Sequence, residues 1–164
     1  LAQELEQKVS GMRFELSTPT LPRNMGLELR QLIEEDLPQR YPAASRLKHT
    51  PRLSALDEVK ELDTSVGMLI YRFVRGALVN VYEHADADHV RIEAERQGDM
   101  LLLRVTDNGQ GFNATHIDRF IREGHYFHII QIRAEQLGGT FNIESERGKG
   151  TTLELKVPLV QRRA

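Results

Sequence analysis

The sequence predicts an α/β protein, a two-layer α/β sandwich in which helices cover one face of a mixed sheet. Residues 65–84 carry apolar side chains at helical spacing, whereas residues 90–95 alternate between apolar and polar side chains, as a half-buried strand does. Residues 100–106 are expected to form a more buried strand, and a second pair of strands is expected at 140–146 and 151–157. Strands joined by tight turns pair in antiparallel fashion, and helices packed on such a sheet give two layers.

The first part of the chain is expected to contain two helices. In residues 1–16, one narrow helical stripe is formed by Leu1, Leu5, Val9 and Met12. Two prolines in residues 17–22 are expected to stop this helix. A second helix is expected over residues 26–37, ending before Pro38. Residues 38–57 contain further prolines and are expected to form a loop with at most one short strand.

The long helix over residues 65–84 has two distinct faces. Its apolar face is formed by Val66, Leu69, Ile70, Phe73, Val74, Ala77, Leu78 and Val81. The opposite face carries Arg72, Gly76, Asn80 and Glu83. Since the apolar face is needed for the core, any chemistry on this helix is expected on the opposite face.

Glycines mark the turns that follow. Residues 97–99 are expected to join the first two strands, and a glycine-rich loop is expected at 107–111. A short helix is expected over 115–122. A longer helix is expected over 126–137, because the two glycines at 138–139 suit a helix C-cap.

Composition limits the class of protein. The 164 residues include 40% hydrophobic and 28% charged side chains, as expected for one soluble domain with a short appended segment. The net charge of -2 argues against broad attraction to nucleic acid. Cysteine is absent, which excludes disulfides, zinc–thiolate sites and cysteine nucleophiles. No apolar run approaches the ~20 residues that cross a bilayer. We therefore expect a cytoplasmic segment without membrane contact, with any membrane anchor upstream of Leu1.

Two polar residues near the end of the long helix are candidate ligands. Asn80 offers an amide oxygen, and Mg²⁺ prefers hard oxygen ligands of this kind. An exposed asparagine on an amphipathic helix, however, needs no ligand to explain it. For His84, contact with the carbonyl groups of a helix end is the commoner explanation.

The segment 107–111 (DNGQG) is a further candidate. Asp107 ends a buried strand, where its carboxylate could accept a hydrogen bond from an exocyclic amine. Gly109 and Gly111 would let the backbone come close to a ligand. A tight turn without any ligand also explains the Asn-Gly pair.

Two later glycines carry weaker signals. Gly124 precedes a helix whose N-terminus could face phosphate groups. Gly150 and Thr151 lie between two strands, where a hairpin turn is a sufficient explanation. Neither position alone indicates a function.

In their order and spacing, the four segments resemble the Bergerat-type ATPase domain shared by histidine kinases, type II topoisomerases, MutL-type repair proteins and the Hsp90 chaperones. The resemblance covers roughly residues 60–160. The Leu-Gly-Gly at 137–139, the Gly-x-Gly-Thr at 148–151 and the Val-Pro at 157–158 closely match histidine kinases within this superfamily. Residues 10–29 resemble the end of the dimerisation helix and the linker of nitrate-sensor-like kinases.

The resemblance implies a role for each matching residue. Asp107 would bind the adenine amino group of ATP, and Asn80 would hold Mg²⁺. The other nucleotide-binding positions would be His84, Gly109, Gly111, Gly124, Gly150 and Thr151. Among these, Gly124 would begin a flexible lid over the phosphates. The implied reaction is the transfer of phosphate from ATP to a histidine, and from there to a response regulator.

The chain departs from the family pattern on the phosphate side. Gly76 stands where the family has a glutamate that acts as general base or positions water, so no catalytic residue is assigned. Glu83 stands where a basic residue usually precedes the histidine, and Tyr126 replaces the second glycine of the lid. Apolar side chains within 126–130 are expected to fill this side of the pocket. We expect adenine recognition to be retained and phosphoryl transfer to be slow or absent.

The resemblance also divides the chain and implies partners. Residues 1–35 are assigned to the end of the dimerisation helix and the linker, and residues 36–164 to the ATPase domain. A helix with one apolar stripe needs a partner, so we expect a homodimer formed through the upstream dimerisation helix. A response regulator is the second expected partner, and none is expected among nucleic acids. No histidine lies in residues 1–16, so the phosphoacceptor is expected upstream of Leu1.

Other readings of the sequence stay open. The chain could be a pseudokinase, a regulatory interaction module with weak or no ATP binding. It could be an anti-sigma-factor serine kinase of the same superfamily, although residues 1–30 argue against this because those proteins lack the dimerisation helix. It could also be a structural α/β domain in which the glycines mark only turns. Whether the chain is an active enzyme is therefore left open by the sequence.

Overall fold

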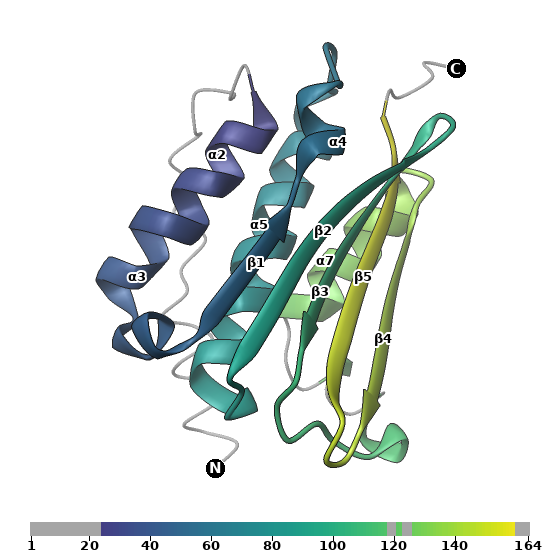
Figure 1. Ribbon diagram of the computed structural model, residues 1–164. Coiled ribbons are helices and arrows are strands. Elements are labelled where there is room, and N and C mark those ends of the chain that lie inside the picture. The colour runs from purple at the N-terminus through teal and green to yellow at the C-terminus, as the bar shows by residue number, and fades with distance from the viewer. Residues whose placement is uncertain (1–23, 118–120, 123–125, 160–164) are drawn as a thin grey trace.

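The computed structural model describes residues 24–117, 121–122 and 126–159. Its helices and strands are, in chain order, α2 (Met25–Gln31), α3 (Leu37–Arg40), β1 (Lys48–Arg52), α4 (Ser54–Asp57), α5 (Thr64–Asn80), β2 (His89–Gln97), β3 (Met100–Asp107), α7 (Tyr126–Gln136), β4 (Thr140–Glu146) and β5 (Gly150–Pro158). Shorter helical turns lie at Leu32–Asp36, Pro42–Arg46, Val81–Ala85 and Ala114–His116. Figure 1 shows the sheet in front, with α5 and α7 behind it. The predicted two-layer α/β sandwich is confirmed.

The sheet has five strands in the order β1-β2-β3-β5-β4. β1 pairs with β2 in parallel, and the remaining pairs are antiparallel. Two parallel neighbouring strands need a long crossover connection, and here α4 and α5 lie in the connection between β1 and β2. β1 is the one short strand expected within residues 38–57, and its Pro51 is tolerated because β1 is an edge strand.

The hydrophobic core lies between α5 and the sheet. All the apolar residues predicted for the buried face of the long helix are buried, each at most 5% exposed. They face alternate residues of the strands, including Val90, Ile92, Leu101, Leu103, Val105, Leu153, Leu155 and Val157. The alternation of apolar and polar residues in the sequence therefore indicates which face of each strand the helices cover.

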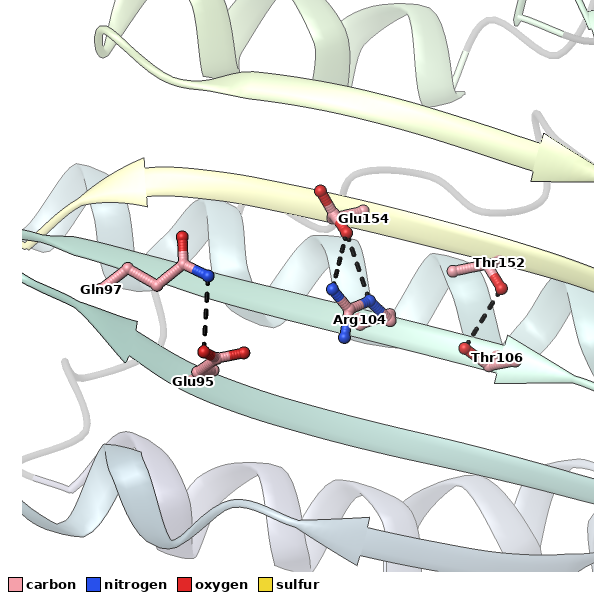
Figure 2. A network of polar contacts seen from close by, with 6 residues as sticks. All are labelled: Glu95, Gln97, Arg104, Thr106, Thr152 and Glu154. Carbon is pink, nitrogen blue, oxygen red and sulfur yellow. Dashed lines mark hydrogen bonds and ion pairs between the residues drawn. The ribbon is translucent and has the colours of Figure 1, made fainter.

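The other face of the sheet carries polar contacts between side chains, which Figure 2 shows. The Arg104 guanidinium lies 3.0 Å from the Glu154 carboxylate on the neighbouring strand. The hydroxyls of Thr152 and Thr106 are 3.3 Å apart. The two residues of each pair lie directly opposite each other in the β3–β5 register, so these contacts stabilise the pairing of the two strands.

The prediction that the second helix ends before Pro38 is wrong. A π-helical turn at Leu32–Asp36 lets the helical structure continue to Arg40. In this turn the backbone N–H of Leu37 donates to the carbonyl of Leu32, five residues earlier. Pro38 therefore falls in the first turn of α3, where a missing N–H costs little.

Some predictions concern residues outside the described part of the chain. These are the helix at 1–16, the lid glycine Gly124 and part of the helix expected over 115–122. The division after residue 35 stays a prediction, and α2 packs into the same core as α5. In the described segments, no helix is both long and apolar enough to span a membrane.

Candidate functional site

Asp107 lies at the end of β3 and is buried, with 5% of its surface exposed. Its carboxylate accepts a hydrogen bond from the backbone N–H of Gly109 at 2.8 Å, and the backbone N–H of Thr151 also favours its charged form. Burial raises the pKa of the Asp107 carboxyl, and the two N–H groups oppose part of this rise because they favour the charged form. The structure thus holds a hydrogen-bond acceptor in a fixed orientation at the end of the sheet.

The loop after Asp107 is fixed on the turn that ends α5. The backbone N–H of Gln110 donates to the carbonyl of Ala85, and the Gln110 side chain donates to the carbonyl of His84, both at 2.8 Å. A Cβ at Gly109 would lie 2.1 Å from the Ala85 carbonyl oxygen. Position 109 must therefore be glycine for the loop to pack against this turn, whether or not a ligand is present.

The same loop is fixed on the β4–β5 hairpin. Gly111 has φ +60°, and a Cβ there would lie 2.2 Å from the carbonyl oxygen of Glu146. The N–H of Gly148 donates to the carbonyl of Gln110 at 2.6 Å. The segments around Asp107 and Thr151, which are distant in the sequence, are thus joined in one site.

Ser145 also belongs to this site, although no sequence pattern indicates it. Its hydroxyl accepts the N–H of Phe112 at 2.9 Å and lies 2.7 Å from the hydroxyl of Thr151. A serine on an ordinary amphipathic strand carries no signal of this role. Only the pairing of β4 with β5, which sets Ser145 opposite Thr151, reveals it.

Asn108 was considered only as part of a turn, but it has a defined structural role. Its side-chain oxygen accepts the backbone N–H groups of both Asp88 and His89 at 2.9 Å. Its own N–H donates to the carbonyl of His89 at 3.2 Å. Asn108 therefore ties the start of β2 to the end of β3, next to Asp107.

Asn80 is the last residue of α5 and is half-buried. A π-helical turn, Val81–Ala85, follows it directly and carries His84, whose Nε2 lies 3.6 Å from the Glu83 carboxylate. Both His84 and Glu83 are exposed. Because this turn also contacts the loop after Asp107, the structure brings the Asn80 and Asp107 segments to the same end of the fold.

Gly76 lies one helical turn before Asn80 and is buried against Tyr126, the first residue of α7. The Tyr126 hydroxyl donates to the backbone carbonyl of Arg72. Tyr126, Phe127 and Ile130 are buried and Ile129 is half-buried, whereas their filling of the phosphate side of a nucleotide pocket stays a prediction. The two departures at positions 76 and 126 are therefore in direct contact.

Comparison with known proteins agrees with this fold and shows the family of the chain. A family model described as "Histidine kinase-, DNA gyrase B-, and HSP90-like ATPase" matches residues 66–161, which include every described candidate site residue. The match covers more than half of the chain. The chain belongs to this ATPase family.

Relatives that match in sequence are sensor proteins. The Sensor protein VraS of Staphylococcus epidermidis is 31% identical over 109 residues, which are 65% of this chain and 30% of that protein. The Sensor protein VraS of Staphylococcus haemolyticus is 36% identical over 90 residues, 55% of this chain and 25% of that protein. The chain therefore spans at most about a third of the length of these relatives.

Two solved structures share the fold. One is the histidine kinase domain of the blue-light activated histidine kinase EL346 from Erythrobacter litoralis, with a TM-score of 0.65 over 96% of this chain and 76% of that chain. The other is full-length ShkA in complex with AMPPNP, with a TM-score of 0.70 over 99% of this chain and 35% of that chain. Each is only 18% identical to this chain, so the likeness, which rests on the TM-scores, shows a common fold and no more.

Proposed function

We propose that the chain is the ATP-binding domain of a two-component sensor histidine kinase, with the base side of the nucleotide site intact and phosphoryl transfer impaired. The observation that carries this proposal is the buried Asp107 carboxylate, oriented by backbone N–H groups at the end of β3. The resemblance to the ATPase family implies that the residue at this position binds the adenine amino group of ATP. A carboxylate acceptor suits such an amine donor.

The surroundings of Asp107 support binding of a rigid base. Hydrogen bonds from Gln110 and Phe112 fix the following loop on the turn Val81–Ala85 after α5 and on β4. The loop is therefore already ordered without nucleotide, and little conformational entropy is lost when a base binds. We assign Gly109, Gly111, Gly150 and Thr151 to the frame of this base site.

The phosphate side keeps one feature suited to a metal ion. The Asn80 amide oxygen, half-buried at the end of α5, would be the protein ligand of Mg²⁺, with His84 nearby. When bound, Mg²⁺ would neutralise charge on the phosphates and share their oxygens. Glu83 is exposed beside His84, and its negative charge disfavours phosphate binding there.

The catalytic group is what this site lacks. Gly76 has no side chain to activate an attacking group, and a general base contributes typically 10²–10⁴-fold to a rate. We therefore propose slow or absent transfer to a histidine. By the same family inference, the partners are a response regulator and a second copy bound through an upstream helix. The pseudokinase alternative is favoured by one specific observation, the contact between Tyr126 and Gly76.

Calorimetric titration of the chain with Mg-ATP tests the proposal. We expect binding by the wild type and a loss of roughly 10–100-fold in affinity for Asp107→Asn, as for loss of a hydrogen bond to a charged acceptor. Asp99→Asn is the matched control, because Asp99 is exposed just before the opposite end of β3. No binding by the wild type, or equal binding by the wild type and Asp107→Asn, would contradict the base-side assignment.

A further inference from the structure

The glycine at position 76 needs a packing explanation. It lies inside α5, where glycine is less stable than alanine and no unusual backbone conformation requires it. A Cβ at this position would lie 2.0 Å from Cε1, 2.7 Å from Cζ and 2.9 Å from Cδ1 of Tyr126. One edge of the aromatic ring therefore occupies the space that any side chain at position 76 would enter.

Tyr126 is held in this position by its hydroxyl. The side chain is 9% exposed, and its hydroxyl donates to the backbone carbonyl of Arg72. Arg72 precedes Gly76 by four residues, so both lie on the same face of α5. In an α-helix the Arg72 carbonyl also accepts the N–H of Gly76, and a carbonyl oxygen can accept two hydrogen bonds. The phenol ring of Tyr126 therefore lies over position 76, in the space that the side chain of any residue larger than glycine would occupy.

A chain of aromatic contacts fixes the start of α7 from the other side. The rings of Tyr126 and Phe127 meet edge to face, with centroids 5.5 Å apart. Phe127 stacks on Phe141 of β4 at 5.7 Å, and Phe141 meets Phe73 of α5 at 6.1 Å. These contacts return to α5, so the first turn of α7 is anchored on α5 directly and through β4.

We propose that Gly76 and Tyr126 form a matched pair in which the tyrosine ring excludes every side chain, a carboxylate included, from position 76. Tyr126 is then a positioning residue that fixes the first turn of α7 on α5 at the phosphate side. The catalytic meaning of this pair rests on the proposed function, whereas the packing relation does not. A consequence is that Gly76→Glu alone cannot restore a carboxylate at this position, because the ring must leave first.

A double-mutant cycle on thermal stability tests the pair in the 164-residue chain. With Tyr126 present, we expect Gly76→Ala to lower the melting temperature by roughly 2–10 °C, because the added methyl overlaps the ring. With Tyr126→Ala, the same substitution should raise the melting temperature by about 2–4 °C, because alanine is the better helix former. Gly76→Ala could also fail to fold while the Gly76→Ala, Tyr126→Ala double variant folds. This outcome supports the pair equally, because the effect of Gly76→Ala again changes from destabilising to tolerated when the ring is removed.

Gly67→Ala is the matched control within α5. Its Cβ would lie 3.2 Å from the end of Met25 and 3.4 Å from a methyl of Leu62, both flexible side chains far from Tyr126 along the helix. Its effect should be the same with Tyr126 and with Tyr126→Ala. If Gly76→Ala also has one and the same effect in both backgrounds, the matched pair is refuted.

Phosphate release from Mg-ATP separates the pair from the proposed function. In the Tyr126→Ala background, Gly76→Glu should exceed Gly76→Gln by at least about tenfold if position 76 is catalytic, since only the carboxylate can act as a base. In the Tyr126 background, neither substitution should raise the rate. A reversed stability cycle without any gain for Gly76→Glu would leave the pair standing and contradict the catalytic part of the proposed function.

Discussion

Two glycines in the β4–β5 hairpin allow a controlled test of how the candidate site is built. Gly148 has φ +84° and Gly150 has φ +86°, so alanine is strained to the same degree at both positions. A Cβ at Gly148 meets nothing within 4 Å, whereas a Cβ at Gly150 would lie 2.0 Å from the carbonyl oxygen of Asp107. Comparison of Gly150→Ala with Gly148→Ala therefore isolates the contact between the hairpin and Asp107.

The expected magnitudes follow from this difference. Left-handed backbone costs a residue with a Cβ about 1–2 kcal/mol, which is the whole expected cost of Gly148→Ala. Gly150→Ala adds the cost of overpacking, about 1–3 kcal/mol, for a total of about 2–5 kcal/mol. In a domain of this size, 1 kcal/mol corresponds to about 2–4 °C in melting temperature. Since Asp107 must move by about 1 Å to restore normal contact, affinity for Mg-ATP should fall about tenfold only in Gly150→Ala.

Thermal unfolding and nucleotide titration of the two variants provide the assay. Gly150→Ala is expected to be the less stable variant and the only one with reduced nucleotide affinity. Equal melting temperatures for the two variants would refute the packing argument. Equal nucleotide affinities in the presence of unequal stabilities would refute the role of Asp107 in binding.

Three further predictions concern the same end of the fold. Asn108→Ala should lower the free energy of unfolding by about 1–2 kcal/mol in denaturant titrations, because it leaves two backbone N–H groups at residues 88–89 without their acceptor; an unchanged midpoint would contradict this. Tyr82→Phe should cost about 1 kcal/mol in the same assay, since it removes the 2.7 Å hydrogen bond to His49, and it should have no effect in a His49→Phe background. Burial raises the pKa of the Asp107 carboxyl above 3.8, so the folded chain binds a proton that the unfolded chain has released. The free energy of unfolding should therefore fall as pH rises from 3.8 through the raised pKa. The same dependence of the free energy of unfolding on pH in Asp107→Asn would contradict this.

The parts of the fold that the sequence predicted are those in which periodicity reflects burial. The apolar face of α5 and the alternation in β2 each have one buried face, so the pattern survives in the sequence. The π-helical turn at Leu32–Asp36 leaves no such pattern, so the sequence predicts a helix end before Pro38 where the helical structure in fact continues.

The sequence singled out Asp107 and Asn80 for the candidate site, but it indicated neither the geometry of the site nor the place of Ser145 in it. Asp107 was noticed because it ends a buried strand, and Asn80 because it lies on the polar face of an amphipathic helix. The sequence explained the glycines by a ligand or by a tight turn, and the structure gives Gly109 and Gly150 a further reason, contact with the backbone of Ala85 and Asp107. Contacts between segments so distant in the sequence depend on strand pairing, which a single sequence does not specify.

The departures at positions 76 and 126 illustrate the same limit. The sequence shows Gly76 and Tyr126 as separate departures from the family pattern, because the two positions are fifty residues apart in the chain. The structure shows that the ring of one occupies the space above the other. The two departures from the family pattern therefore meet in one contact between α5 and α7.

Titration of the chain with ATP, ADP and adenosine, each with and without Mg²⁺, tests the central claim most directly. If the base side of the site is intact and the phosphate side is altered, all three ligands should bind, with affinities that differ by less than about tenfold. Mg²⁺ should then change the ATP affinity only slightly. Binding of ATP at least about a hundredfold tighter than adenosine, dependent on Mg²⁺, would contradict the account.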